Sequence, residues 1–189
     1  MVNNPNINAR EIMKLQVVKQ LGLNDYKYLI SKLKLVNTES NVKYQKKFNS
    51  LYKVRRNSDW RKEYYKYLEK NKANKGIKFE SIIEYLYENT QKIEPSFSSK
   101  MLATIDVDKP IWDGRILERL DLKRKWDKRH DINNAVDVYD DICKWYKEYE
   151  KTEEYLSNIK VFDEFLPEYE DISDTKKIDC LLWGWDKGD

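Results

Sequence analysis

The chain of 189 residues carries a formal net charge of +3, and 40% of its residues are hydrophobic and 13% aromatic. Its 14 tyrosines and six tryptophans supply enough apolar surface for a buried core, which excludes an intrinsically disordered chain. Only five glycines and four prolines, with few alternating apolar stretches, argue against a β-rich protein and predict an all-α fold. We expect a single all-helical domain over residues 1–189, with two lobes, 1–92 and 93–189, as the alternative arrangement.

The charges are distributed unevenly along the chain. Residues 1–130 hold 29 Lys and Arg against 16 Asp and Glu, whereas residues 131–174 hold 4 against 14. A basic body favours a polyanionic partner, because Lys and Arg side chains release counterions from a phosphate backbone. We therefore expect a nucleic-acid partner and expect the acidic segment to face away from it. The alternative is a solvated, lysine-rich surface on a protein that binds no nucleic acid.

The residues that commonly hold metals are few. Cys143 and Cys180 show no metal-ligand spacing and His130 is the only histidine, so we expect no metal and no organic cofactor. The N-terminal stretch is polar, and no apolar run reaches the length of a bilayer. We expect a monomeric, cytoplasmic protein that does not associate with membranes.

Helical periodicity predicts a series of helices in the first half of the chain. Aromatic residues recur at intervals of four in two of them, at Tyr44, Phe48 and Tyr52 and then at Trp60 and Tyr64. Such stripes favour core packing over base stacking. The expected helices cover residues 9–21, closed by Gly22, and then 24–36, 40–57, 57–72 and 79–93.

The stretch Pro95–Leu120 predicts a helix, a tight connection and a second helix. Pro95 suits the first helical position, and Ser96 and Ser98 can hydrogen-bond amide groups of the first turn. The "DVDKP" connection has turn chemistry. Asp113 stands where the N-cap of the second helix belongs, directly before "GRILERL". A structural cap is the simplest interpretation of that carboxylate.

This stretch resembles a segment of helix-hairpin-helix DNA glycosylases. A serine-rich helix start, then "ML", a short loop and "PIWDGRILERL" are similar to the segment that ends in the catalytic aspartate of these enzymes, with archaeal-type 8-oxoguanine glycosylases as the nearest likeness. The closing "KKIDCLLWGWDKGD" is similar to their last helix. The resemblance implies a glycosylase-like helical fold and base-excision repair of DNA, in which Asp113 stabilises an oxocarbenium-like sugar. It also implies a base pocket walled by Trp112, Trp183 and Trp185, with Lys187 as a further candidate.

The chain departs from the glycosylase pattern at two points. The Schiff-base lysine of the bifunctional enzymes would fall near Ser96, where no lysine stands, but Lys100 lies one helical turn further on the same face. If Lys100 reaches the anomeric carbon, it can supply covalent catalysis. The hairpin "NTQKIEPSFSSK" also lacks the glycines of the family hairpin. Two functions therefore stay open: a glycosylase, monofunctional or catalytically degenerate, and a non-catalytic module of the same fold that binds nucleic acid or protein.

The segment "DLKRKWDKRHD" follows the Asp113 helix. A basic cluster with one embedded aromatic residue suits phosphate contact plus stacking, whereas the alternative is an exposed loop whose tryptophan packs on the core. For His130 we expect a surface or capping role rather than general-base catalysis. The candidate nucleic-acid contacts are Ser96, Ser98, Arg115, Lys123, Arg124, Lys125, Trp126, Lys128 and Arg129.

The last part of the chain predicts further helices. Between residues 132 and 166 an apolar stripe is expected to face the core, and the final helix is expected to begin at a cap formed by Asp174. The stripe comprises Val136, Tyr139, Ile142, Trp145 and Tyr146.

Overall fold

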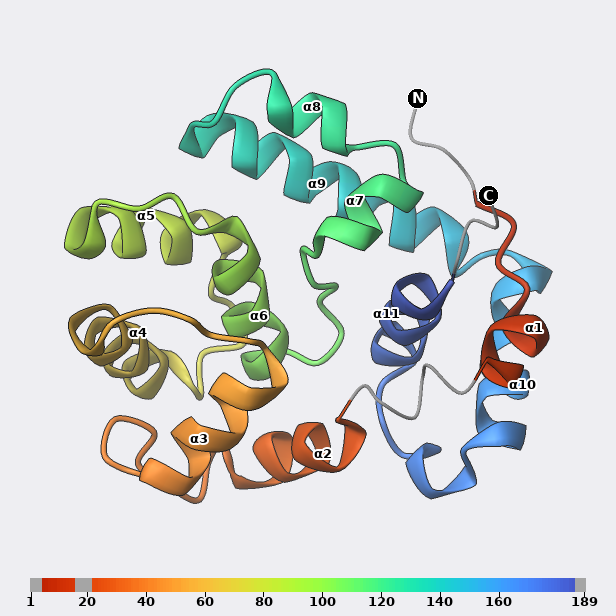
Figure 1. Cartoon of the computed structure of the whole chain (residues 1–189), viewed down its shortest axis with the longest axis horizontal. Helices are drawn as coiled ribbons and strands as arrows, with labels where there is room; N and C mark the ends of the chain where they lie inside the picture. The colour runs from red at the N-terminus through yellow and green to blue at the C-terminus, as the bar shows by residue number, and fades with distance from the viewer. Residues whose placement is uncertain (1–4, 16–21, 186–189) are drawn as a thin grey trace. The chain divides into compact units, whose positions relative to one another are not determined.

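The computed structural model describes residues 5–15 and 22–185 (Figure 1). Every regular element in these ranges is a helix, which confirms the all-α class. Within the same ranges, no helix is both long and apolar enough to cross a membrane. The chain divides into two compact units, one formed by residues 22–106 and the other by residues 1–21 together with 107–189. These ranges differ from the two lobes considered above, and the single-domain organisation stays a prediction.

Five helices build the unit of residues 22–106. Helix α2 packs against α3, α4 against α5, and α5 against α6. Figure 1 shows α5 lying alongside α4, with α6 running across the end of α5. The helices are α2 (Leu23–Lys32), α3 (Val42–Leu51), α4 (Ser58–Asn71), α5 (Phe79–Thr90) and α6 (Pro95–Ile105).

The core of this unit is a cluster of aromatic rings. The ring of Phe48 on α3 lies 5.6 Å from that of Tyr64 and 5.8 Å from that of Tyr65, both on α4. The Tyr64 ring in turn stacks on Trp60, with centroids 4.9 Å apart. The hydroxyl of Tyr64 donates to the carbonyl of Phe97 on α6 over 3.0 Å, so the same side chain links two helices. The four-residue aromatic repeats are therefore core stripes, as predicted.

Gly22 stands at the start of a helix. It is the N-cap of α2 with φ at 67°, in the left-handed region that favours glycine, and a Cβ atom there would lie 3.0 Å from Leu51. The first helix, α1, spans Ala9–Lys14. The predicted continuation to residue 21 lies outside the described residues.

The second unit contains α1 and the helices that follow residue 106. Helix α1 packs against α10 and α11, and α8 packs along α9. The buried amide of Asn158 on α10 holds the chain before α1, because it donates to the carbonyl of Ile7 and accepts from the N–H of Ala9. The elements are α7 (Gly114–Arg119), α8 (Lys123–Asp127), α9 (Ile132–Tyr149), α10 (Glu153–Phe165), the 3-10 helix η2 (Pro167–Tyr169) and α11 (Asp174–Gly184).

Helix α9 carries the apolar stripe expected from the sequence. Tyr139, Ile142, Trp145 and Tyr146 are buried, whereas Val136 is only half-buried. Helix α11 begins differently from the prediction. Its N-cap is Ser173, whose Oγ accepts from the N–H of Lys176, and not Asp174, because the serine is the residue with extended backbone at the helix start.

Candidate functional site

Asp113 caps a helix. Its backbone is extended, and Oδ1 accepts a hydrogen bond from the N–H of Arg115 over 3.0 Å at the start of α7. The side chain is half-buried. The simplest interpretation of the sequence is therefore confirmed, and any chemical role of Asp113 has to be compatible with this cap.

The connection that leads to Asp113 is held in place by hydrogen bonds to α9 and α11. Ser173 Oγ donates to the carbonyl of Val107 over 2.7 Å, and Tyr139 Oη donates to the carbonyl of Pro110 over 2.9 Å. The carboxylate of Asp179 accepts from the backbone N–H of Ile111. Because these bonds satisfy backbone groups of the turn, they fix the position from which α7 starts.

Asp179 is itself an unusual residue, since it is a fully buried carboxylic acid on α11. Tyr146 Oη on α9 donates to its Oδ1 over 2.6 Å. Burial raises the pKa of Asp179 to about 7, against the opposing effects of Lys176 and of the Tyr146 hydrogen bond. The charge on Asp113 adds to the rise. Near neutral pH this carboxyl is thus divided between its protonated and ionised forms.

Two arginines of α7 cover the end of α11. Arg115 donates from Nη1 to the carbonyl of Trp183 over 3.0 Å, and its guanidinium lies 4.1 Å from the centre of that indole ring. Arg119 donates to the carbonyl of Trp185 and lies 5.4 Å from its ring. Carbonyl groups at a helix C-terminus lack partners within the helix and attract cations. These arginines therefore serve as a C-terminal cap of α11.

The three tryptophans expected to wall a base pocket do not share one environment. Trp112 is buried, with 4% of its surface exposed, and packs edge-on against Trp126. Trp183 and Trp185 are half-buried beneath the guanidinium groups of α7. Lys187 lies outside the described residues. A base pocket formed by these side chains stays a prediction.

Lys100 lies in a different environment from that of Asp113. It belongs to the unit of residues 22–106, whereas Asp113 belongs to the other unit. Lys100 has 8% of its surface exposed, and its ammonium group donates to Ser96 Oγ over 2.9 Å. The same group lies 5.7 Å from the ring of Tyr52 and 5.4 Å from that of Phe97. Ser96 and Lys100 do share a helix face, as their spacing predicted.

The turn between α5 and α6 has an acidic residue where an anion would have to approach. Glu94 is the N-cap of α6, and its carboxylate forms two hydrogen bonds with the guanidinium of Arg56, over 2.7 and 3.0 Å. Pro95 at the first helical position supplies no N–H group. Ser98 is fully buried and donates to the carbonyl of Glu94. This geometry gives a phosphate group few donors at the start of α6.

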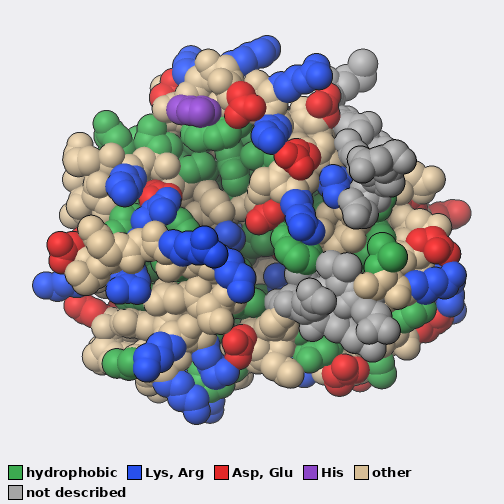
Figure 2. Space-filling model, viewed as in Figure 1, with side chains coloured by type: hydrophobic (Ala, Val, Ile, Leu, Met, Phe, Trp, Pro, Cys, Tyr) green, Lys and Arg blue, Asp and Glu red, His purple; other side chains and the backbone are tan. Residues whose placement is uncertain are grey.

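The basic cluster of residues 123–129 forms a helix and the turn after it. Figure 2 shows Lys and Arg side chains gathered over α8. Three of the cations are ion-paired, Lys123 with Glu118, Lys125 with Asp141 and Arg129 with Asp131. Among the described residues, neither Arg124 nor Lys128 has an acidic partner, and both are exposed. We name this surface, residues 123–130, the α8 surface.

The turn between α8 and α9 is fixed from below by one buried amide. The side chain of Asn134, which has 6% of its surface exposed, donates to the carbonyls of Lys125, Trp126 and Arg129. Its backbone N–H is in turn held by the N-cap Asp131. These bonds satisfy the C-terminal carbonyls of α8, and so they hold the α8 surface in one conformation.

His130 was not among the residues predicted to form the site. Its imidazole stacks on the Trp126 ring, with centroids 4.7 Å apart and an interplanar angle of 25°. The signal in the sequence is the spacing of four between the two rings.

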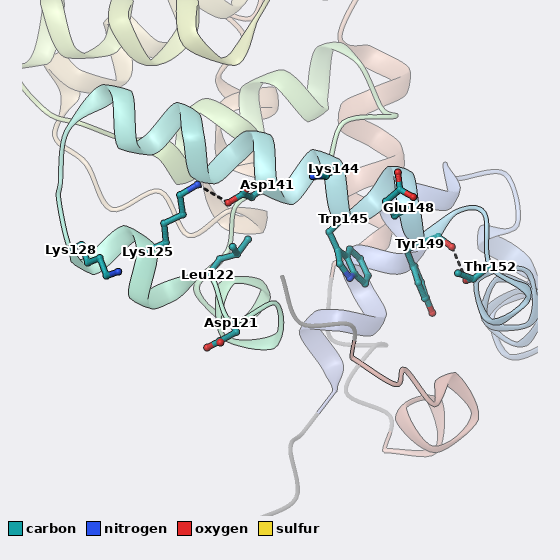
Figure 3. A pocket seen from close by; sticks show the side chains of 10 residues that line it. All are labelled: Asp121, Leu122, Lys125, Lys128, Asp141, Lys144, Trp145, Glu148, Tyr149 and Thr152. Atoms are coloured by element: carbon teal, nitrogen blue, oxygen red, sulfur yellow. Dashed lines mark hydrogen bonds and ion pairs between the residues drawn. The ribbon is translucent and has the colours of Figure 1, made fainter. Parts of the chain in front are cut away.

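A pocket of about 760 Å³ lies beside the α8 surface (Figure 3). Lys125 on α8 and Lys128 directly after it contribute to its wall, and Trp145 and Tyr149 project into it from α9. The last two rings stack on each other at 4.7 Å. Asp113 lines neither this pocket nor the two smaller ones described, at residues 57–92 and 108–175.

Within the described ranges, no group of three or more His, Cys, Asp or Glu side chains is placed to bind a metal ion. Comparison with protein-family models, with curated proteins and with solved structures gives no significant match to this chain.

Proposed function

We propose that the protein binds DNA through the α8 surface and that it has the fold of the helix-hairpin-helix glycosylases without their catalysis. The observation that carries the proposal is the α8 surface itself. Five cations lie within seven residues, of which Arg124 and Lys128 are exposed and have no acidic partner in the described part of the chain. Asn134 holds the segment in shape before any ligand binds. A preorganised cationic surface of this kind suits contact with a phosphate backbone.

The proposed binding is strongly dependent on salt but not tight. If two to five of these cations contact phosphates, the logarithm of the duplex association constant falls with the logarithm of salt concentration with a slope of about −2 to −4.5. The ion pairs of Lys123, Lys125 and Arg129 have to exchange their carboxylate for a phosphate, which reduces the gain.

The environment of Lys100 and Asp113 favours binding over catalysis. The Lys100 ammonium is buried and hydrogen-bonded to Ser96, so attack on a sugar requires both the loss of that bond and access for the sugar. Asp113 serves as a helix cap and lines none of the three pockets. The α5–α6 turn carries Glu94 where a phosphate would approach.

The test is fluorescence anisotropy with a labelled duplex over a range of salt concentrations. The double variant Arg124→Glu/Lys128→Glu is expected to lose at least tenfold in affinity and to give a shallower salt slope. The matched control is Lys147→Glu/Lys160→Glu, which changes net charge equally at exposed positions of the same unit. If the control loses as much affinity as the α8 variant, the binding is not located on α8.

A second function, a monofunctional glycosylase, is favoured by one observation on Asp113. Only Oδ1 is used by the cap, and within the described residues Oδ2 has no hydrogen bond, so one carboxylate oxygen remains for a sugar cation. Base release from duplexes that contain 8-oxoguanine or uracil tests this function. Activity lost in Asp113→Asn establishes the glycosylase, and borohydride trapping lost in Lys100→Ala would add a lyase step.

A further inference from the structure

Three aromatic rings form a ladder that runs from the core of the unit to its surface. Trp112, the innermost, is buried and meets Trp126 edge-on, with centroids 5.3 Å apart and an interplanar angle of 88°. Trp126 is half-buried and stacks nearly parallel with His130. His130 is the outermost ring, with 62% of its side chain exposed. The ladder therefore ends at the His130 ring, which is exposed to solvent on its outer side and stacks on Trp126 on its inner side.

We infer that His130 is a stacking platform for an unpaired nucleobase, so that the preferred partner of the α8 surface is a single-stranded or locally unpaired nucleic acid. This inference rests on the proposed function, because it takes the α8 surface as the phosphate-binding site. Aromatic side chains that stack bases and cations that follow the backbone are the two components of single-strand recognition.

The position of His130 supplies both components at one place. Lys128 and Arg129 directly precede it in the chain, and Arg124 lies on the helix that carries Trp126. A base on the outer face of the imidazole thus has cations beside it for the adjoining phosphates. In an intact duplex the flat faces of the bases are covered by their neighbours in the stack, so His130 can reach one only at an end or at an unpaired position.

The platform is held rigidly, which reduces the entropy lost on binding. Trp126 limits the imidazole on its inner side. Asn134 binds the carbonyls of Trp126 and Arg129, the residues on either side of the turn that leads to His130. The Oδ1 atom of Asp127 lies 3.9 Å from Nε2 of the ring.

The test compares three probes at one salt concentration by fluorescence anisotropy. They are an oligothymidylate, a blunt-ended duplex of equal length with internal label, and an oligomer of abasic sugar phosphates that keeps the backbone and lacks the bases. Wild type is expected to bind the oligothymidylate more tightly than the other two. Base–aromatic stacking contributes about 1–3 kcal/mol per base, so His130→Ala is expected to lose about 5-fold to about 150-fold in affinity on oligothymidylate alone.

Two further variants of His130 test whether its aromatic ring, rather than its charge, contributes the affinity, and thermal melts check that the fold is kept. His130→Phe keeps an aromatic face and is expected to retain most of the affinity, whereas His130→Gln is expected to behave as the alanine variant does. Thermal melts of each variant show whether Trp126 and the turn keep their structure. A phenylalanine variant as weak as the alanine variant would mean that the imidazole acts through charge, and it would overturn the inference.

The remaining outcomes distinguish this inference from the proposed function. If wild type binds DNA, Arg124→Glu/Lys128→Glu abolishes binding and His130→Ala changes nothing, the α8 surface stands and the platform is refuted. Equal affinity of wild type for oligothymidylate and for the abasic oligomer would refute it as well. If wild type binds none of the probes at low salt, the proposed function fails, and the platform fails with it.

Discussion

The phenol of Tyr146 donates a hydrogen bond of 2.6 Å to the carboxyl group of Asp179, and both residues are buried between α9 and α11. Since burial raises the pKa of Asp179 from 3.8 to about 7, the folded chain holds this proton where the unfolded chain has lost it. The contribution of Asp179 to the free energy of unfolding is therefore most favourable below pH 4, and it falls as the pH rises towards 7. A shift of this size corresponds to a free-energy cost on the order of 4 kcal/mol above pH 7.

Asp179→Asn removes the carboxyl group that gives rise to this pH dependence. Wild type is expected to be more stable at pH 5 than at pH 8 by about 2–3 kcal/mol, and the variant is expected to lose most of this difference because asparagine does not ionise. Urea unfolding at the two pH values measures it. Glu170→Gln, an exposed change in the same unit, is the control and should keep the wild-type difference. An unchanged difference in Asp179→Asn would show that the pH dependence has another source.

The ion pair between Arg56 and Glu94 gives a second prediction, for the unit of residues 22–106. Only 8% of the Glu94 side chain is exposed, and Arg56 is its bidentate partner. Arg56→Ala leaves this carboxylate buried without its cation, which is expected to lower the free energy of unfolding by about 3 kcal/mol. The neighbouring Arg55 is exposed, so Arg55→Ala is expected to change it by less than about 0.5 kcal/mol. Equal effects in urea unfolding would contradict the role given to the pair.

The hydroxyl of Tyr64 gives a third prediction. It is fully buried and donates to the Phe97 carbonyl, so Tyr64→Phe removes this hydrogen bond between α4 and α6. The expected loss is about 1–2 kcal/mol in the free energy of unfolding. Tyr87→Phe removes a hydroxyl from an exposed ring and is expected to cost almost nothing. A Tyr64→Phe protein as stable as wild type would mean that this hydrogen bond does not contribute to stability.

The amide of Asn134 gives a fourth prediction, which concerns the α8–α9 turn. Asn134→Ala removes donors from the carbonyls of Lys125, Trp126 and Arg129, and the turn is expected to open more often. Trypsin cleavage after Lys128 or Arg129 should then become several-fold faster. Asn133 is the exposed neighbour, and Asn133→Ala should leave the cleavage rate as it is in wild type.

Asn134→Ala also tests whether the rigidity of the α8–α9 turn contributes to DNA binding. If the proposed surface is preorganised by Asn134, the alanine variant should bind DNA more weakly although no phosphate contact has been removed. Faster cleavage with unchanged DNA affinity would show that the rigidity of the turn does not contribute to DNA binding.

Local signals in the sequence were sufficient for the helix starts that depend on one residue. Pro95 at the first position of α6 and Asp113 as the cap of α7 follow from backbone chemistry alone, and both are found as predicted. Gly22 shows the limit of such signals, because a left-handed glycine can end one helix or begin the next. In the structure it begins α2, and a Cβ atom at this position would lie 3.0 Å from Leu51 on α3, a contact that local sequence does not reveal.

The contacts that build the candidate site depend on residues far apart in sequence. Arg115 was predicted to bind nucleic acid, but its guanidinium meets Trp183, a residue that periodicity alone does not place near it. The pairing of the N-terminal segment with residues 107–189 in one unit has the same origin, since it includes contacts such as those of Asn158 with Ile7 and Ala9. Burial of Asp179 likewise becomes visible only once α9 and α11 are packed together.

The most direct measurement of where DNA binds is lysine footprinting, in which surface amines are acetylated with and without DNA and quantified by mass spectrometry. The account predicts that DNA protects Lys128 and Lys123 on the α8 surface, whereas Lys147 and Lys160, exposed in the same unit, react equally in both samples. The protection should disappear at high salt, when binding is lost. Protection confined to the unit of residues 22–106, or none on α8 when the protein is saturated with DNA, would contradict it.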